Sequence, residues 1–446
     1  MPRRVKIIAT IGPASAKREI LEKMVEKGLD AMRLNMSHGD HEEHQAKVDI
    51  WREIAPDKPI IVDLTGPSIR TVVDQPLVVK EGEKVVIGKD FSTSRDISGI
   101  VKPGDEILID DGRIRLKVEK VEGNNIVAVV TVGGEIKNKK SINIPGADIS
   151  YDLPTEKDKK DMLWGIKNDA EVFFASFVNH AEDVLAVKEF LKEHGSDAWV
   201  FAKIESELGV RNAKEILEAA DGIVVARGDL GVEIPMEKVP AIQKELIMLA
   251  REIGKPVVVA TQMLTSMVDH PFPTRAEVSD VANAVLDGAS ALMVSNETAV
   301  GKYPVEVIET LVKIILANQD DTDVREEVAY EDDADAVALS AIKLIEKMGA
   351  RFIITPTNSG KSPRKIARFR PKAKIIAVSD NPSLLRKLQL VYGVETKLAD
   401  DPISYHTFMS IVDELKRKGR ARKGDAIACV NVAGQGGTHT IRITRA

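Results

Sequence analysis

The chain has 446 residues, of which 43% are hydrophobic and 30% are charged. This length predicts about three domains, and the composition excludes both a disordered polypeptide and a small stapled scaffold. Lys and Arg number 63 against 69 Asp and Glu, so the formal net charge is −6; this argues against a nucleic-acid-binding protein, which normally carries a basic face.

Eight short β-branched runs, each followed by an amphipathic helical pattern, occur in the first 300 residues. They span residues 5–12, 31–37, 59–63, 172–177, 199–205, 222–229, 256–261 and 291–296. Strands that alternate with helices indicate βα units with a parallel sheet, and eight units predict a (β/α)8 (TIM) barrel. Polar residues follow each run, at the face where barrel enzymes build their sites.

The pattern changes twice along the chain. Residues 71–145 form short alternating runs broken by Gly- and Asp-rich turns, which predict an all-β insertion placed to act as a lid. After an acidic stretch at 320–335, strands at 352–356, 374–378, 426–432 and 438–444 indicate a second α/β domain. We therefore expect a barrel of residues 1–71 and 148–325, a lid of residues 72–147, and a C-terminal α/β domain of residues 326–446.

Cysteine and hydropathy indicate the cellular setting. Cys429 is the single cysteine, which excludes an intramolecular disulfide and favours a reducing, cytoplasmic environment. No run approaches the roughly 20 apolar residues of a membrane span, and the N-terminus lacks the pattern of a signal peptide. We expect no membrane and no nucleic-acid partner.

Charged residues end the fifth and sixth runs. Lys203 and Glu205 alternate along a strand and should point the same way. In the next run, Gly228 lets backbone N–H groups approach an anion, and Asp229 can hold a hard cation. A lysine beside a divalent metal held by two carboxylates suits phosphoryl transfer. The alternative is an ion pair inside the barrel.

The second and third runs add five polar residues. Arg33, Asn35 and Ser37 alternate and should be aimed together. Asp63 ends the third run, and Arg70 follows after a short turn. The arginines are candidate phosphate clamps because a guanidinium grips two oxygens, whereas Asn35, Ser37 and Asp63 offer oxygens to a cation. As an alternative, Asn and Ser at strand ends cap the next helix.

Three further residues end strands or begin helices. Thr261 ends the seventh run, where its hydroxyl could orient a substrate or a proton-relaying water. His38 and His44 follow the second run, and we expect both to be surface residues rather than catalysts.

In order along the chain, these motifs resemble the pyruvate kinase family, and the resemblance covers nearly the whole sequence. The matching segments are residues 10–13, 33–39, 66–71, 109–112, 143–146, 203–205, 226–231, 260–264, 273–277, 280–288 and 295–299. The resemblance implies transfer of phosphate from phosphoenolpyruvate to ADP, giving pyruvate and ATP in the last step of glycolysis.

The resemblance also assigns roles. Lys203 matches the lysine that stabilises the phosphoryl group in flight, and Glu205 and Asp229 match ligands of Mg²⁺ or Mn²⁺. Lys203, Thr261 and Arg33 form the expected catalytic set. The substrate contacts would be Arg33, Lys203, Gly228, Asp229 and Thr261, and the nucleotide contacts Asn35, Ser37, His38, Arg70 and Lys140.

A monovalent-cation site is implied at Asn35, Ser37, Asp63 and the carbonyl of Leu64. Here the segment reads Asp63-Leu64-Thr65-Gly66-Pro67-Ser68, where potassium-dependent members have Asp-Thr-Lys-Gly-Pro-Glu. Loss of one charge of each sign beside the cation leads us to expect weak or absent potassium dependence.

A loop in the C-terminal domain has the composition of an anion site. Its residues are Thr357, Asn358, Ser359, Gly360, Lys361 and Ser362, between a strand and a helix. Hydroxyls, N–H groups and a lysine suit a phosphate, although such a loop can also simply cap its helix. By resemblance, this loop holds a phosphorylated allosteric effector, and the enzyme is a homotetramer.

Two rival functions remain at this stage. Another Mg²⁺-dependent phosphoenolpyruvate or pyruvate barrel enzyme would have no need of Lys140 and Arg70 near a lid. A catalytically inactive nucleotide or phosphate sensor would have no need to keep Lys203, Glu205 and Asp229 together.

Overall fold

A computed structural model of the chain describes residues 3–147, 149, 153–320, 332–432 and 439–446. A parallel barrel closes in the order β1-β17-β16-β15-β14-β13-β3-β2, which confirms the eight predicted units. Its strands are β1 (Lys6–Thr10), β2 (Ala31–Asn35), β3 (Ile60–Asp63), β13 (Val172–Ala175), β14 (Trp199–Ile204), β15 (Gly222–Ala226), β16 (Val257–Ala260) and β17 (Ala291–Val294).

Helices surround the barrel. They are α1 (Arg18–Lys27), α2 (His41–Ile54), α3 (Glu156–Lys167), α4 (Ala181–Glu193), α5 (Glu207–Arg211), α6 (Ala213–Ala219), α7 (Arg227–Glu233), α8 (Val239–Ile253), α9 (Arg275–Asp287), α10 (Asn296–Ala299) and α11 (Pro304–Asn318). The longer ones, such as α8 and α11, bury an apolar face. Local chemistry sets their ends: Thr155 and Thr274 begin α3 and α9 with capping boxes, and Gly254 and Gly288 end α8 and α9 in the left-handed conformation.

The insertion is an all-β domain with its own apolar core, as predicted. It contains β4 (Ile69–Val72), β5 (Leu77–Val79), β6 (Lys84–Ile87), β7 (Ser92–Thr93), β8 (Glu106–Ile109), β9 (Ile114–Glu122), β10 (Asn125–Val132), β11 (Gly134–Ile136) and β12 (Ser141–Asn143). The expected boundary between residues 71 and 72 falls inside β4, which pairs with β12 and β7 of this domain. The expected boundary at 147/148 touches residue 148, outside the described residues.

The C-terminal domain is a five-stranded sheet in the order β20-β19-β18-β21-β22 with helices on its faces. Its elements are α12 (Asp333–Lys347), β18 (Phe352–Pro356), α13 (Lys361–Ala367), β19 (Lys374–Ser379), α14 (Pro382–Leu388), β20 (Val394–Leu398), α15 (Tyr405–Arg417), β21 (Ala426–Asn431) and β22 (Thr440–Arg445). The sequence missed β20 because it is an edge strand that alternates charged with apolar residues and buries little of its length. The expected boundary at 325/326 and residue 438 lie outside the described residues.

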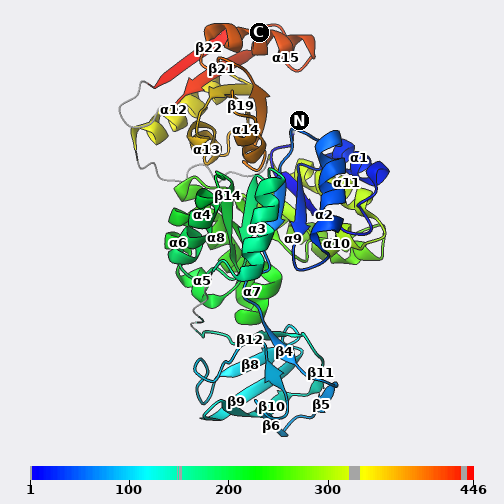
Figure 1. Cartoon of the computed structure of the whole chain (residues 1–446). Helices are drawn as coiled ribbons and strands as arrows, with labels where there is room; N and C mark the ends of the chain where they lie inside the picture. The colour runs from blue at the N-terminus through cyan, green and yellow to red at the C-terminus, as the bar shows by residue number, and fades with distance from the viewer. Residues whose placement is uncertain (1–2, 148, 150–152, 321–331, 433–438) are drawn as a thin grey trace.

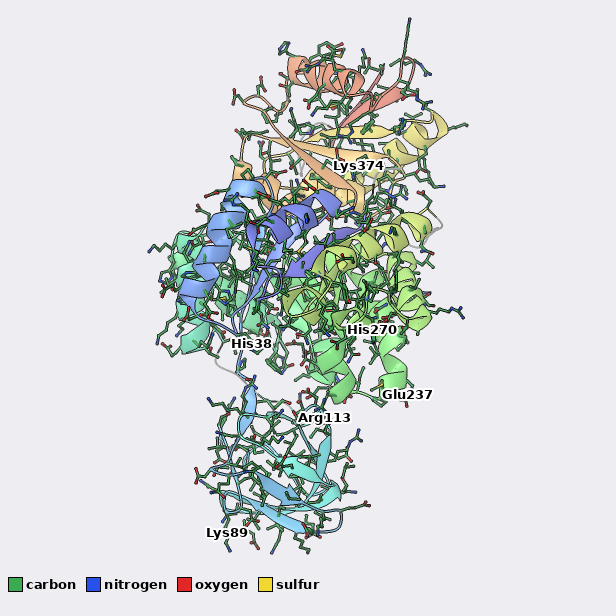
Figure 2. The ribbon with its side chains drawn as sticks, turned by 90° about the vertical axis from the view of Figure 1, so that its right-hand side faces the viewer. His38, Lys89, Arg113, Glu237, His270 and Lys374 are labelled. Carbon is green, nitrogen blue, oxygen red and sulfur yellow. The ribbon has the colours of Figure 1, made fainter. Side chains whose placement is uncertain are left out.

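The two added domains lie at opposite ends of the barrel (Figure 1). The lid faces the carboxyl ends of the strands, and the C-terminal domain covers the other end. Lys374, at this second junction in Figure 2, donates from Nζ to the carbonyl of Arg3 over 2.7 Å. In the described part of the chain, no helix has both the length and the apolar character needed to cross a bilayer.

Candidate active site

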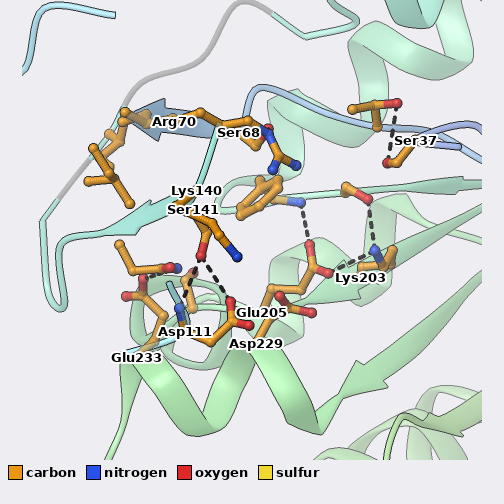
Figure 3. Close-up of a pocket in the computed structure, with 18 of the residues that line it drawn as sticks. Ser37, Ser68, Arg70, Asp111, Lys140, Ser141, Lys203, Glu205, Asp229 and Glu233 are labelled. Carbon is orange, nitrogen blue, oxygen red and sulfur yellow. Dashed lines mark hydrogen bonds and ion pairs between the residues drawn. The ribbon is translucent and has the colours of Figure 1, made fainter. Parts of the chain in front are cut away.

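A cavity of about 440 Å³ lies between the carboxyl ends of the barrel strands and the lid (Figure 3). We call it the main cavity. Residues singled out in the sequence from both domains line it: Arg33, Asn35, Ser37, His38, Asp63, Leu64, Arg70, Lys140, Lys203, Glu205 and Asp229. Residues separated by up to about 200 positions therefore meet, because the parallel strands and the lid converge at one end of the barrel.

Lys203 lies on the wall of this cavity, surrounded by carboxylates. Its Nζ is 2.8 Å from Glu205 Oε1 and 3.6 Å from Asp63 Oδ1. Burial lowers the pKa of Lys203, but Asp63, Glu205 and Asp229 outweigh burial and raise the pKa above its usual range. The side chain therefore carries a fixed positive charge at neutral pH, which suits stabilisation of a phosphoryl group.

Arg33 is held rigidly on the neighbouring part of the wall. Its Nε donates to Asp63 Oδ2 over 2.6 Å, and Nη1 donates to Thr10 Oγ1 over 2.6 Å. The residue is buried, so its guanidinium is fixed before any ligand arrives and loses little conformational entropy when it binds an anion.

Asp229 does not end a strand, as the sequence suggested; it lies in the first turn of α7. Burial, followed by the negative charge of Glu205, raises the pKa of its carboxyl group. A divalent cation between Asp229 and Glu205 would offset this repulsion, and carboxylate oxygens are suitable ligands for it. Among the described residues, no group of three or more His, Cys, Asp or Glu side chains is placed to hold a metal ion.

Gly228 and Thr261 form a pair beside the main cavity without lining it. The N–H of Gly228 donates to Thr261 Oγ1 over 2.7 Å, and that hydroxyl donates to the carbonyl of Ala260. Thr261 has φ of 68°, a left-handed conformation that is costly for a β-branched residue. Strain of this kind concentrates at functional sites.

The lid contributes its own charged groups. Lys140 Nζ donates to Asp110 Oδ1 over 2.7 Å, and Ser141 Oγ donates to Asp111 Oδ1 over 2.9 Å. Arg70 Nη1 donates to the carbonyl of Lys139 over 3.0 Å, which fixes the arginine at the base of the lid.

The sequence did not assign roles to several residues that line the main cavity: Asp110, Asp111, Asn143, Ser176 and Glu233. Asn143 Nδ2 of the lid donates to Glu233 Oε1 of α7 over 2.9 Å, joining lid and barrel. Asp110 and Asp111 both have positive φ. Two signals in the sequence could have indicated them: the Asp-Asp-Gly turn and the family resemblance of residues 109–112.

A second cavity of about 740 Å³ adjoins the first, and the two share Arg33, Asn35 and His38 as lining residues. His38 is exposed, as expected. The expectation that His44 is exposed was wrong: it is 2% exposed, and its Nε2 bonds to the carbonyl of His38 over 2.9 Å. Burial, with Lys47 nearby, lowers the pKa of His44 to about 4.

The expected ligands of a monovalent cation line one cavity, but three of them already make other hydrogen bonds or ion pairs. Asn35 Oδ1 accepts from the N–H of Ser37 over 3.1 Å, and the carbonyl of Leu64 accepts from Ser176 Oγ over 2.8 Å. Asp63 is paired with Arg33.

The C-terminal loop presents only part of its polar surface. Asn358, Ser359 and Lys361 are exposed. Thr357 and Ser362 are buried, and their hydroxyls already serve the loop and the sheet: Thr357 Oγ1 accepts from the N–H of Gly360, and Ser362 Oγ donates to the carbonyl of Val432.

Comparison with known proteins agrees with the geometry. Residues 2–308 match the model of the pyruvate kinase barrel domain, and residues 335–444 match that of the pyruvate kinase alpha/beta domain. The chain belongs to the pyruvate kinase family. It is a phosphotransferase with pyruvate kinase function, an enzyme of glycolysis.

Named relatives are similar over almost the full length. The chain is 43% identical to pyruvate kinase of Geobacillus stearothermophilus, covering 99% of this chain and 80% of that one. It is 38% identical to pyruvate kinase of Thermotoga maritima, covering 99% of each. The crystal structure of a pyruvate kinase from Cryptosporidium parvum superposes with a TM-score of 0.94 at 33% identity, covering 99% of this chain and 96% of that one.

Proposed function

We propose that the main cavity transfers the phosphoryl group of phosphoenolpyruvate to ADP, with Lys203 as the cation that meets this group in flight. The observation that carries the proposal is the placement of Lys203 beside Glu205 and in the field of Asp229, all on one cavity wall. Arg33, fixed by Asp63 and Thr10, would hold the phosphate of the donor.

Glu205 and Asp229 would hold a divalent cation, Mg²⁺ or Mn²⁺, whose chemistry is to neutralise charge on the phosphoryl and enolate oxygens. Residues of the chain would bind and orient the substrate and exclude water. Gly228 and Asp229 would contact the substrate, and the Thr261 hydroxyl would orient the substrate or the water that delivers a proton to carbon. The lid above the cavity would exclude bulk water, which would otherwise accept the phosphoryl group.

The nucleotide would enter from the lid side. Arg70 and Lys140 line the main cavity from the lid, and Asn35, Ser37 and His38 line it from the barrel. The second cavity, with a volume of about 740 Å³, has room for the nucleoside. It adjoins His38 and Asn35, and its largely apolar wall suits the base.

Potassium would have little effect on this enzyme. Asp63, the one charged ligand of the expected cation site, is already paired with Arg33 and lies 3.6 Å from Lys203 Nζ. With its charge balanced in this way, a monovalent cation would add little stabilisation. The rate should be similar in potassium and in a bulky organic cation such as tetramethylammonium, and a large fall in the latter would refute this proposal.

The exposed side chains of Asn358, Ser359 and Lys361 would contribute to binding a phosphorylated effector. The family resemblance supports a homotetramer, and the single Cys429 supports a cytoplasmic location. The β4 pairing supports a lid that begins near residue 69 rather than 72.

Steady-state kinetics test the proposed reaction. Purified enzyme with phosphoenolpyruvate, ADP and Mg²⁺ should form pyruvate and ATP in equal amounts. Formation of another product from phosphoenolpyruvate would favour a different barrel enzyme, and nucleotide binding without turnover would indicate a sensor.

A further inference from the structure

Ser176 lies at the carboxyl end of β13, between β3 on one side and β14 on the other. The residue is 3% exposed and lines the main cavity. Its hydroxyl bonds in both directions: Oγ is 2.8 Å from Lys203 Nζ and 2.8 Å from the carbonyl oxygen of Leu64. In Figure 3, one dashed line from Lys203 marks its hydrogen bond to this hydroxyl and another marks its ion pair with Glu205.

The direction of these hydrogen bonds follows from the groups themselves. An ammonium can only donate, and a carbonyl oxygen can only accept. Ser176 must therefore accept from Lys203 and give its single hydroxyl proton to Leu64. Both roles of the hydroxyl are used, so its rotation is fixed.

The backbone around Ser176 is held closely in place. Gly66 packs against it so tightly that a Cβ at Gly66 would lie 2.8 Å from Ser176 Cβ. The next residue, Phe177, has φ of 58°, and its N–H donates to Glu205 Oε2 over 2.8 Å. Two successive residues therefore hold Lys203 and Glu205, one through a hydroxyl and the other through a backbone N–H.

We propose that Ser176 is a positioning residue for phosphoryl transfer, which fixes the ammonium of Lys203 through a neutral acceptor. This inference rests on the proposed role of Lys203. A carboxylate that binds the ammonium offsets part of its charge, whereas a hydroxyl orients it and leaves the charge available to the phosphoryl group. Ser176 takes one of the three ammonium hydrogens and Glu205 takes a second. Asp63 Oδ1, at 3.6 Å from Nζ, is beyond ordinary hydrogen-bond distance, so the third hydrogen stays available to a ligand in the cavity.

Without the hydroxyl, Asp63 and Glu205 would be the remaining partners of the ammonium. Lys203 would move toward these carboxylates and away from the position that a reacting phosphorus needs. The loss should fall on the transition state more than on substrate binding, because Arg33 keeps its own contacts with Asp63 and Thr10.

The test compares Ser176→Ala with Ser290→Ala. Ser290 is also a buried barrel serine, 2% exposed, but its Oγ accepts from the N–H of Val257 at the opposite end of the barrel. For Ser176→Ala we expect kcat to fall about tenfold or more, with the KM for phosphoenolpyruvate within about twofold of wild type. Ser290→Ala should keep wild-type kcat, even if its melting temperature falls as far as that of Ser176→Ala.

The inference is overturned if Ser176→Ala keeps kcat within about twofold of wild type, or if KM rises while kcat does not change. An equal loss of kcat in Ser290→Ala would also overturn it, because the effect would then be one of stability. If Ser176→Ala does not fold, Ser176→Cys fills the site with a slightly larger thiol that is only a weak acceptor, and the same limits on kcat and KM apply. Wild-type enzyme assayed in parallel separates the two proposals: a wild type that forms no pyruvate contradicts the proposed function itself.

Discussion

Replacement of Lys203 by Met is the most direct perturbation of the proposed chemistry. The change removes one positive charge and keeps most of the side-chain volume. At an effective dielectric constant of about 20, a unit charge about 4 Å from a phosphoryl oxygen contributes about 4 kcal/mol. If this interaction is made mainly in the transition state, its loss lowers kcat about a thousandfold.

The structure predicts that the loss is at least this large. Glu205 Oε1 lies 2.8 Å from Lys203 Nζ and Asp63 Oδ1 lies 3.6 Å from it, so Lys203→Met leaves negative charge facing the incoming phosphate. Binding of phosphoenolpyruvate should change by only a few-fold because Arg33 remains fixed. Pyruvate formation, measured in a coupled assay across substrate concentrations, gives kcat and KM separately.

A matched variant controls for loss of a paired lysine. Lys188 Nζ is 2.9 Å from Asp221 Oδ2 and donates to the carbonyl of Ala219, away from the main cavity. Lys188→Met should lower the melting temperature without lowering kcat. A Lys203→Met enzyme that folds and retains kcat within about tenfold of wild type would refute the assignment of Lys203 to phosphoryl transfer.

Three further measurements test a metal ligand, a contact between lid and barrel, and a buried lysine. Asp229→Asn should raise the Mg²⁺ concentration needed for half-maximal rate by about tenfold or more, and an unchanged Mg²⁺ titration would exclude Asp229 as a ligand. Asn143→Ala breaks the 2.9 Å bond to Glu233 that joins lid and barrel, so the KM for ADP should rise about threefold at unchanged melting temperature; an unaltered KM would show that this contact does not guide the lid. Burial lowers the pKa of Lys6 to about 7. Between pH 7 and 9 the folded chain therefore releases a proton that the unfolded chain keeps. The free energy of unfolding should rise by about 2 kcal/mol over this range. Urea unfolding of wild type and Lys6→Met at both pH values measures this difference, which should be absent in the variant. An equal change in the free energy of unfolding between pH 7 and 9 in both proteins would contradict the prediction.

Much of the fold could be predicted because the signals are local. Apolar runs followed by amphipathic helices gave the eight barrel strands, and the turn-rich segment gave the lid. The prediction failed at β20, an edge strand that contains charged residues. It also failed at Asp229, which lies in the first turn of α7 and does not end β15. His44 was predicted to be exposed because it is polar. In the structure it is buried, and its ring nitrogen makes a hydrogen bond with the carbonyl of His38.

The order of residue types along the chain determined which groups gather at the carboxyl end of the barrel, since the period of two fixes which strand residues share a face. Only the tertiary structure decided which of them touch. That Ser176 lies between Lys203 and Leu64, that Asn143 meets Glu233, and that Asp63 is already paired with Arg33 depends on barrel closure and on the placement of the lid. These are contacts between distant segments, and their distances are set by packing that no local pattern records.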